Sequence, residues 1–200
     1  MPKPINPIDQ RTIQGNDNRC GGYCMDVLLY ELNFHQQFKP GITYNEMLQE
    51  QERSMNYNSL SYTFVDNSIF NGTKVLLPST IAKRASSFAD RVCVLQEQGV
   101  RFPQNLIQEE NDKINNFAHE KAPDTLVDHI QVVQSINAVI RNAPNNTFYF
   151  VVLDNGNNTY HWNLVKIENG TLHCYNTNGI WTQGFPINMM GVAIEIKPKH

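Results

Sequence analysis

The chain has 200 residues, of which 40% are hydrophobic, so it can bury one substantial core. Its formal net charge is −3 and its basic residues are scattered, which is not the charge pattern of a nucleic-acid-binding protein or of a membrane-surface helix. Four cysteines are too few for a disulfide scaffold at this length, so we expect reduced thiols.

The N-terminal dozen residues carry prolines at positions 2, 4 and 7 and are expected to form an extended lead-in (1–12) to a single domain spanning 1–200. This segment lacks the apolar run of a secretory signal, and no segment has the length of a transmembrane helix. We therefore expect a cytoplasmic protein, or one secreted into a host cell without a classical signal peptide.

Two helices are expected next. The first begins at Cys20 and ends near Asn33, because apolar residues recur along it and glycines are tolerated in its first turn. The second covers roughly 44–54, where Thr43 and Glu46 resemble a capping box.

Three further helices are expected before residue 145. The first starts at Ser79 and ends at Gly99, the second covers 104–120, and the third starts at Asp124 and ends at Pro144. Apolar residues at helical spacing support the first and third of them.

The pattern changes after residue 144, where four strands are expected at 147–153, 160–167, 171–176 and 191–196. Asn-Gly pairs at 155–156 and 169–170 are strong signals for tight hairpin turns. Helices followed by an antiparallel sheet predict an α+β fold.

Cys20 is the candidate nucleophile. The reactive form of cysteine is the thiolate, which a helix N-terminus and a nearby imidazolium both favour. Cys20 stands at an expected helix start, and the Gly-Gly pair after it lets a substrate backbone come close. Gln14, six residues earlier, could join the Cys20 N–H in holding an oxyanion, and Asp17 could instead orient a histidine.

His161 is the candidate general base. A two-residue turn at 169–170 would pair 161 with 178 and 163 with 176, so these four residues would share one face of the sheet. That face would carry His161 with the amides of Asn163, Asn176 and Asn178, and an amide oxygen accepting from the ring N–H would fix its tautomer. Trp162 is expected to point to the opposite face, into the core.

Metal and cofactor sites are not indicated. The Cys-x-x-x-Cys spacing from Cys20 to Cys24 lacks a second cluster, His161 has no ligand at i+4, and neither a phosphate loop nor a serine-nucleophile motif is present. We expect no cofactor and no metal.

These residues resemble the papain-like cysteine peptidase superfamily in the order of Cys20, His161 and an Asn, with a glutamine shortly before the cysteine. The motif Cys-x-x-x-Cys-x-x-x-Leu-Leu from Cys20 and the His-Trp pair at 161 are closest to Josephin-type deubiquitinases. In that comparison Asn176 keeps the family spacing, and Asn178 keeps the Asn-x-Asn alignment.

The Asp17-x-x-Cys20 and His161-Trp-Asn163 segments are also similar to ovarian-tumour-type deubiquitinases, and the order of Cys, His and Asn to bacterial papain-like effectors. The resemblance covers about forty residues near the two ends, and 35–145 match nothing in it.

The resemblance implies a papain-like fold, with an N-terminal catalytic helix and central helices packed on the C-terminal sheet. It implies a thiol protease or isopeptidase acting on a protein substrate such as ubiquitin or a ubiquitin-like protein, through Cys20, His161 and Asn176 with Gln14 at the oxyanion. Two alternatives stay open: a glutamine deamidase or transglutaminase-like effector with the same triad, and a non-catalytic α+β binding module.

Overall fold

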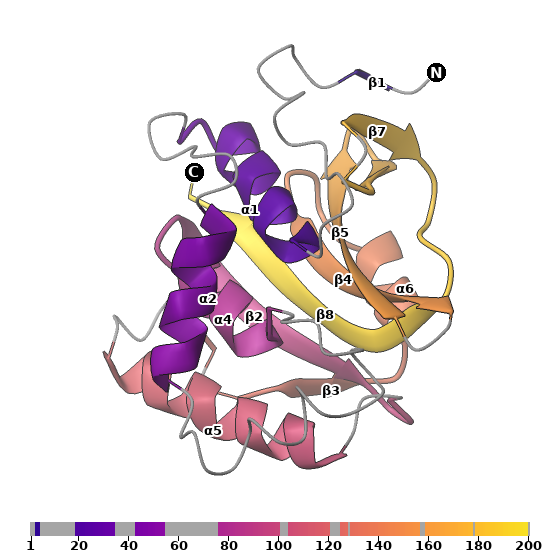
Figure 1. The fold of residues 1–200 in the computed structure, drawn as a ribbon. Helices are drawn as coiled ribbons and strands as arrows, with labels where there is room; N and C mark the ends of the chain where they lie inside the picture. The colour runs from indigo at the N-terminus through magenta and orange to yellow at the C-terminus, as the bar shows by residue number, and fades with distance from the viewer. Residues whose placement is uncertain are drawn as a thin grey trace.

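The computed structural model describes residues 3–4, 19–34, 43–54, 76–100, 104–120, 125–127, 129–156, 159–177 and 179–199. Over these residues the protein has an α+β fold in which helices cover a mixed β-sheet (Figure 1). The helices are α1 (Cys20–Glu31), α2 (Thr43–Ser54), α4 (Pro78–Ala85), α5 (Gln104–Glu120) and α6 (Ile136–Arg141). The strands are β1 (Lys3–Pro4), β2 (Ala89–Glu97), β3 (Gln131–Val133), β4 (Phe148–Gly156), β5 (Thr159–Glu168), β6 (Thr171–Tyr175), β7 (Ile180–Gln183) and β8 (Met189–Pro198).

The described strands form one eight-stranded sheet in the order β1-β7-β6-β5-β4-β8-β2-β3. All neighbouring strands are antiparallel except β2 and β3, which are parallel. The sheet is thus mixed and wider than the four antiparallel strands that the sequence predicts.

The β5–β6 hairpin confirms the predicted turn. Glu168 pairs with Thr171, so the turn consists of Asn169 and Gly170 alone. Both turn residues have positive φ, 52° and 70°, as a type I′ turn requires. The other predicted turn, at 155–156, is wrong, because β4 continues through Gly156 and the connection falls at 157–158, outside the described residues.

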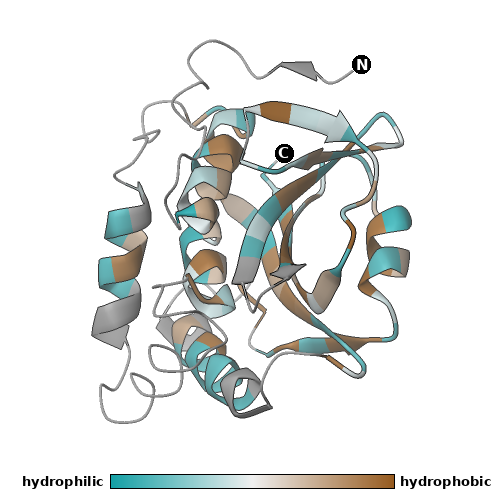
Figure 2. Ribbon diagram, turned by 45° about the vertical axis from the view of Figure 1, so that its right-hand side comes forward, coloured by the Kyte–Doolittle hydropathy of each residue, from teal (hydrophilic) through white to brown (hydrophobic). Residues whose placement is uncertain are grey.

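The core has two layers, one on each face of the sheet. The larger layer lies between the sheet and helices α1, α2, α4 and α5, and Figure 2 shows how hydrophobic residues follow the strands that it covers. The smaller layer lies under α6, which contributes Ile136 and Ile140. Trp162 belongs to the larger layer, as predicted.

Two predicted helices are wrong in part. The one expected from Ser79 to Gly99 ends at Ala85, and β2 takes up its second half. Strand β2 lies between β8 and β3, and its residues 92–95 are buried on both faces of the sheet. Such a strand is apolar at every position, so its hydrophobic pattern does not distinguish it from a buried helix.

The helix expected from Asp124 to Pro144 is shorter as well. Leu126 makes an isolated bridge to Val92, β3 pairs with β2, and only α6 is helical. Ser135 caps the N-terminus of α6, since its hydroxyl accepts a hydrogen bond from the N–H of Ala138 at 3.3 Å.

The helices at 20–33, 44–54 and 104–120 are confirmed within their boundaries. The hydroxyl of Thr43, the first residue of α2, donates to Asp26 Oδ1 on α1 at 2.5 Å. Thr43 therefore joins two helices at the start of α2.

Candidate active site

Cys20 is the first residue of α1, where a helix presents N–H groups that its own carbonyls cannot satisfy. The N–H groups of Gly22 and Tyr23 both bond to the carbonyl of Arg19, which closes the first turn. This first turn contains no acidic residue of its own that would oppose the positive end of the helix dipole. A helix N-terminus stabilises the negative charge of a thiolate.

Close to this position, the start of strand β5 extends beyond the end of its pairing with β6. The main-chain N–H and C=O groups of successive residues in a strand point alternately to its two neighbouring strands. Ile167 donates to Thr147 on the β4 side, so the N–H and C=O of Trp162 point to the β6 side. The β6 ladder ends where Leu164 pairs with Tyr175. Its next hydrogen-bonded pair would contain Trp162, whose N–H and C=O therefore need other partners.

The thiols of Cys20 and Cys24 are those partners. The N–H of Trp162 donates to Cys20 Sγ at 3.3 Å, and the thiol of Cys24 donates to the carbonyl oxygen of Trp162 at 3.3 Å. Two sulfurs one turn apart on α1 thus occupy the place that a residue of β6 would fill. Cys20 Sγ is held against the backbone of the residue that directly follows His161.

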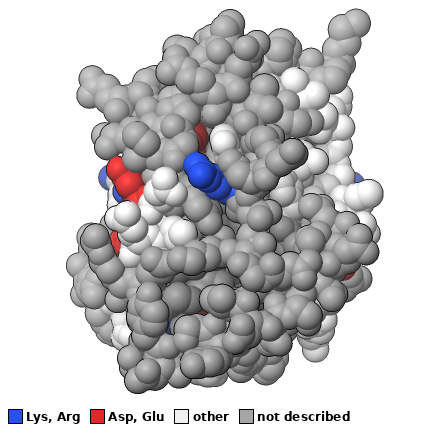
Figure 3. Space-filling model, in the orientation of Figure 1, with Lys and Arg blue, Asp and Glu red and all other residues white. Residues whose placement is uncertain are grey.

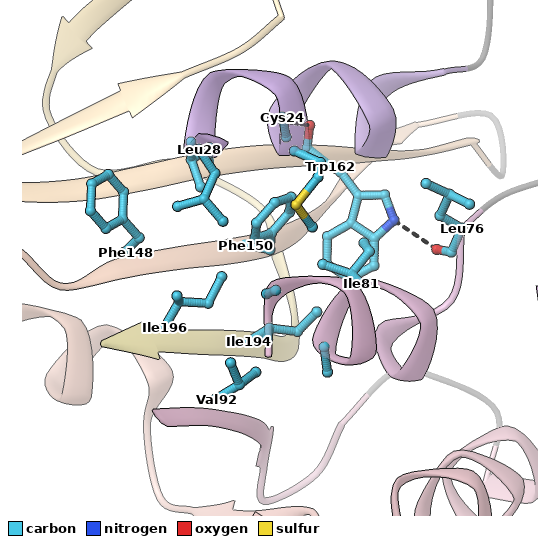
Figure 4. Packing of buried hydrophobic residues seen from close by; sticks show 14 of the residues in the cluster. Cys24, Leu28, Leu76, Ile81, Val92, Phe148, Phe150, Trp162, Ile194 and Ile196 are labelled. Atoms are coloured by element: carbon cyan, nitrogen blue, oxygen red, sulfur yellow. Dashed lines mark hydrogen bonds between the residues drawn. The ribbon is translucent and has the colours of Figure 1, made fainter. Parts of the chain in front are cut away.

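The indole of Trp162 packs beside this contact between α1 and β5. Its Nε1–H donates to the carbonyl oxygen of Leu76 at 2.9 Å, and Figure 4 shows the ring lying between α1 and the start of α4. Gly21 permits the close packing, because a Cβ there would lie 3.1 Å from Leu76 Cδ1 and 3.2 Å from Trp162 Cδ1. This close contact explains why the residue after Cys20 is a glycine.

The His161 ring is held from the chain that follows β6. Its Nε2 lies 3.2 Å from Thr177 Oγ1, and the Asn176 side chain also hydrogen-bonds to His161. Burial lowers the pKa of His161 from its usual 6.5, and the Asn176 bond opposes that shift. At neutral pH the ring is therefore uncharged and able to accept a proton.

The three other thiols are poor nucleophiles. Burial raises the pKa of Cys24 well above its usual value, and the negative charge of a nearby Cys20 would raise it further. Burial also raises the pKa of Cys93 to about 11 and that of Cys174 above its usual value. These three remain protonated near neutral pH.

Cys20 is itself buried, with 5% of its surface exposed, and it belongs to the larger core layer. A cysteine that only fills space also has this burial. Its sulfur also has a polar contact, since it accepts a hydrogen bond from the main-chain N–H of Trp162.

Asn163 lies on the opposite face of the sheet from Trp162 and does not bond to His161. It is 3% exposed, and its Nδ2 donates to Cys174 Sγ at 3.4 Å. Its Oδ1 is buried and without a hydrogen-bond partner among the described residues. Of the amides proposed to orient the histidine, Asn176 is the one that the described residues place on its ring.

Three further predicted residues, Gln14, Asp17 and Asn178, lie outside the described residues. Two residues that sequence reasoning missed are Cys24, as a partner of the β5 edge, and Thr177, on the histidine ring. The spacing of four from Cys20 to Cys24, one helical turn, was the only signal for the first. Nothing in the sequence marks the second.

Over the described part of the chain, no three or more His, Cys, Asp or Glu side chains gather closely enough to bind a metal ion. On the face seen in Figure 3, the described charged side chains form no broad patch of one sign. None of the helices in the described segments combines the length and the apolar character needed to cross a bilayer.

No family model matches the chain, and no curated protein or solved structure is significantly similar to it. The site must be interpreted from its own chemistry. A thiol at a helix N-terminus, a backbone N–H on its sulfur, and an uncharged imidazole held by a hydroxyl and an amide form a set suited to nucleophilic attack on a carbonyl.

Proposed function

We propose that this protein is a cysteine hydrolase with a papain-like arrangement, which cleaves an amide bond through Cys20, His161 and Asn176. The favoured substrate is an isopeptide bond at the C-terminus of ubiquitin or a ubiquitin-like protein. The choice of substrate rests on the resemblance to Josephin-type and ovarian-tumour-type deubiquitinases, and the choice of chemistry rests on the site.

In the first half-reaction, His161 takes the thiol proton and Cys20 Sγ attacks the carbonyl carbon, which forms a C–S bond and a tetrahedral oxyanion. The protonated His161 then gives its proton to the leaving amine as the C–N bond breaks. A water molecule, deprotonated by His161, hydrolyses the thioester, so that a carboxylate leaves and the thiol is restored. Asn176 orients the ring throughout.

The oxyanion would be held by the backbone N–H of Cys20, with Gln14 as the second donor. Gln14 lies outside the described residues, so its part in the site remains a proposal from the sequence.

The observation that supports this function most directly is the 3.3 Å hydrogen bond from the N–H of Trp162 to Cys20 Sγ. It joins the start of α1 to the start of β5, which are separated by more than half of the chain. The donor supports a thiolate together with the helix N-terminus at Cys20, a combination that Cys174, which accepts from Asn163 within β6, does not have.

Alkylation by iodoacetamide at pH 6 tests the nucleophile. Cys20 should be modified rapidly and alone, because the pKa values of the three other thiols are raised. His161→Ala should abolish the rapid phase, whereas His173→Ala, in which another histidine of the same sheet is removed, should leave it intact. Slow modification of all four thiols, unchanged by His161→Ala, would show that the protein is not a thiol enzyme.

Ubiquitin with an electrophilic C-terminus then tests the substrate. A covalent adduct at Cys20, absent in Cys20→Ala, supports the isopeptidase. If no adduct forms while Cys20 remains selectively reactive, the isopeptide proposal is wrong. Release of ammonia from a protein glutamine would then assign the same triad to deamidation.

A further inference from the structure

Thr177 has a backbone conformation that its side chain disfavours. Its φ is +47°, in the left-handed region, where a β-branched residue crowds its own backbone. Such strain persists only where surrounding contacts fix it, and it concentrates at functional sites. Thr177 is also buried, with 5% of its surface exposed, so its conformation is set by the interior of the protein.

The strain has an identifiable result at the sheet edge. A continued β6 would place Thr177 opposite Trp162, and its backbone would then pair with the N–H and C=O of Trp162. The chain instead turns away after Tyr175, and the thiols of Cys20 and Cys24 occupy that place. The departure of Thr177 from the ladder is therefore a condition for the thiol to reach β5.

The same turn brings the Thr177 hydroxyl to the histidine. Oγ1 lies 3.2 Å from His161 Nε2, within hydrogen-bond distance for an N–H donor and a hydroxyl acceptor. A hydroxyl that accepts from Nε2–H keeps the proton of the neutral ring on that nitrogen, so Nδ1 carries the lone pair that can take the thiol proton. The Asn176 bond supports the ring as well, but Asn176 is exposed to solvent.

We propose that Thr177 is a positioning residue of the hydrolase, whose strained backbone and buried hydroxyl hold His161 in the Nε2–H tautomer facing Cys20. This inference rests on the proposed function and adds to it a residue that the papain-like resemblance does not supply. Thr177 acts through His161 and does not touch the substrate.

Three variants separate the hydroxyl from the backbone. Thr177→Val keeps the shape and the β-branch but lacks the hydroxyl, Thr177→Ser keeps the hydroxyl, and Thr177→Gly removes the hydroxyl while relieving the left-handed strain. The second-order rate of Cys20 alkylation is measured as a function of pH, together with the ¹⁵N chemical shifts of the His161 ring, which distinguish its tautomers.

Thr177→Val should slow alkylation of Cys20 by about tenfold, the worth of one hydrogen bond to a group that becomes charged, and Thr177→Ser should stay within about twofold of wild type. The ¹⁵N shifts of Thr177→Val should show a reduced Nε2–H population. Thr177→Gly should also slow alkylation although its melting temperature is not lowered, which a merely structural role would not produce.

Full alkylation rates in both Thr177→Val and Thr177→Gly, with unchanged ¹⁵N shifts, would overturn the positioning role. The His161→Ala variant distinguishes this failure from failure of the function. If His161→Ala alkylates slowly while the Thr177 variants alkylate normally, only the role of Thr177 is lost. If His161→Ala also alkylates normally, the thiol enzyme itself is refuted.

Discussion

The buried carboxyl of Asp26 should make the stability of this protein fall as the pH rises. Asp26 lies on α1, the helix that begins with Cys20, and it is 1% exposed. Burial raises its pKa from 3.8 to about 7. The hydrogen bond from Thr43 and the charge of Arg84 oppose that shift, and the charge of Glu46 adds to it.

The sign follows from which state binds the proton. Between the unfolded pKa of 3.8 and the folded pKa of about 7, the folded chain holds a proton on Asp26 and the unfolded chain does not. The stabilising contribution is thus complete below the unfolded value and is lost as the pH rises through the folded value. Three pKa units at roughly 1.4 kcal/mol each amount to about 4 kcal/mol, an upper figure because a buried site relaxes when it ionises.

The perturbation is Asp26→Asn, which keeps the shape and the acceptor for Thr43 but does not titrate. Urea unfolding of both proteins between pH 4 and pH 8 gives the difference in free energy of unfolding, in which the effects of all other groups cancel. As the pH rises, the free energy of unfolding of the wild type should fall relative to that of Asp26→Asn by about 1.4 kcal/mol per pH unit over most of that range. A difference that stays constant with pH would refute the reasoning, because Asp26 would then have the same pKa in both states.

Three further outcomes are expected. In an NMR titration, the pKa of His161 should lie below 6.5 and should fall further in Asn176→Ala, because the Asn176 bond favours the charged ring; a pKa above 6.5 would contradict this. Glu110→Ala should lower the free energy of unfolding by about 2–3 kcal/mol, since buried Glu110 accepts hydrogen bonds from N and Oγ of Ser79 at 2.5 and 3.0 Å; a loss below roughly 0.5 kcal/mol in urea unfolding would argue against it. Gly21→Ala should reduce stability by about 1 kcal/mol, because overpacking against two buried side chains exceeds the gain in helix propensity; a variant that melts higher than wild type would show that the neighbours give way.

The β5–β6 hairpin was predictable because its signal is local. Asn169 and Gly170 both favour positive φ, and the alternation on either side fixes which residues face each other. The register that follows from this turn is the observed one as far as the pair of Leu164 and Tyr175. A turn of two residues leaves the flanking strands no other register.

Strand β2 was not predictable in the same way. Val92 and Val94 face the larger core layer while Cys93 and Leu95 face the smaller one, so all four are apolar and the alternation disappears. What decides between strand and helix here is the pairing with β8 and β3, and no local pattern contains that information.

The candidate site likewise has features that local sequence determines and features that depend on tertiary packing. Placing Cys20 at a helix start required only the residues around it, and placing Asn176 near His161 required only the turn at 169–170. That β6 stops at Tyr175 depends on how the following chain packs, as in the contact of the Tyr175 ring with Trp181 at 5.7 Å between centroids. The sequence therefore pointed to the residues proposed to react but not to the sheet edge beside which they lie.

That edge also determines what Cys24 does. Its thiol is kept protonated by burial, and a protonated thiol is the form that can donate to the carbonyl of Trp162. Cys20, at the end of the same helix, accepts from the N–H of the same residue, and an acceptor is the role that a thiolate fills best. Two cysteines in one motif thus have opposite roles because the N–H and C=O of one strand residue point to the same side. In the proposed enzyme, ionisation of Cys24 in place of Cys20 would leave the carbonyl of Trp162 without its donor and would weaken the acceptor for its N–H, so the anchoring of α1 on β5 would be coupled to the ionisation of Cys20.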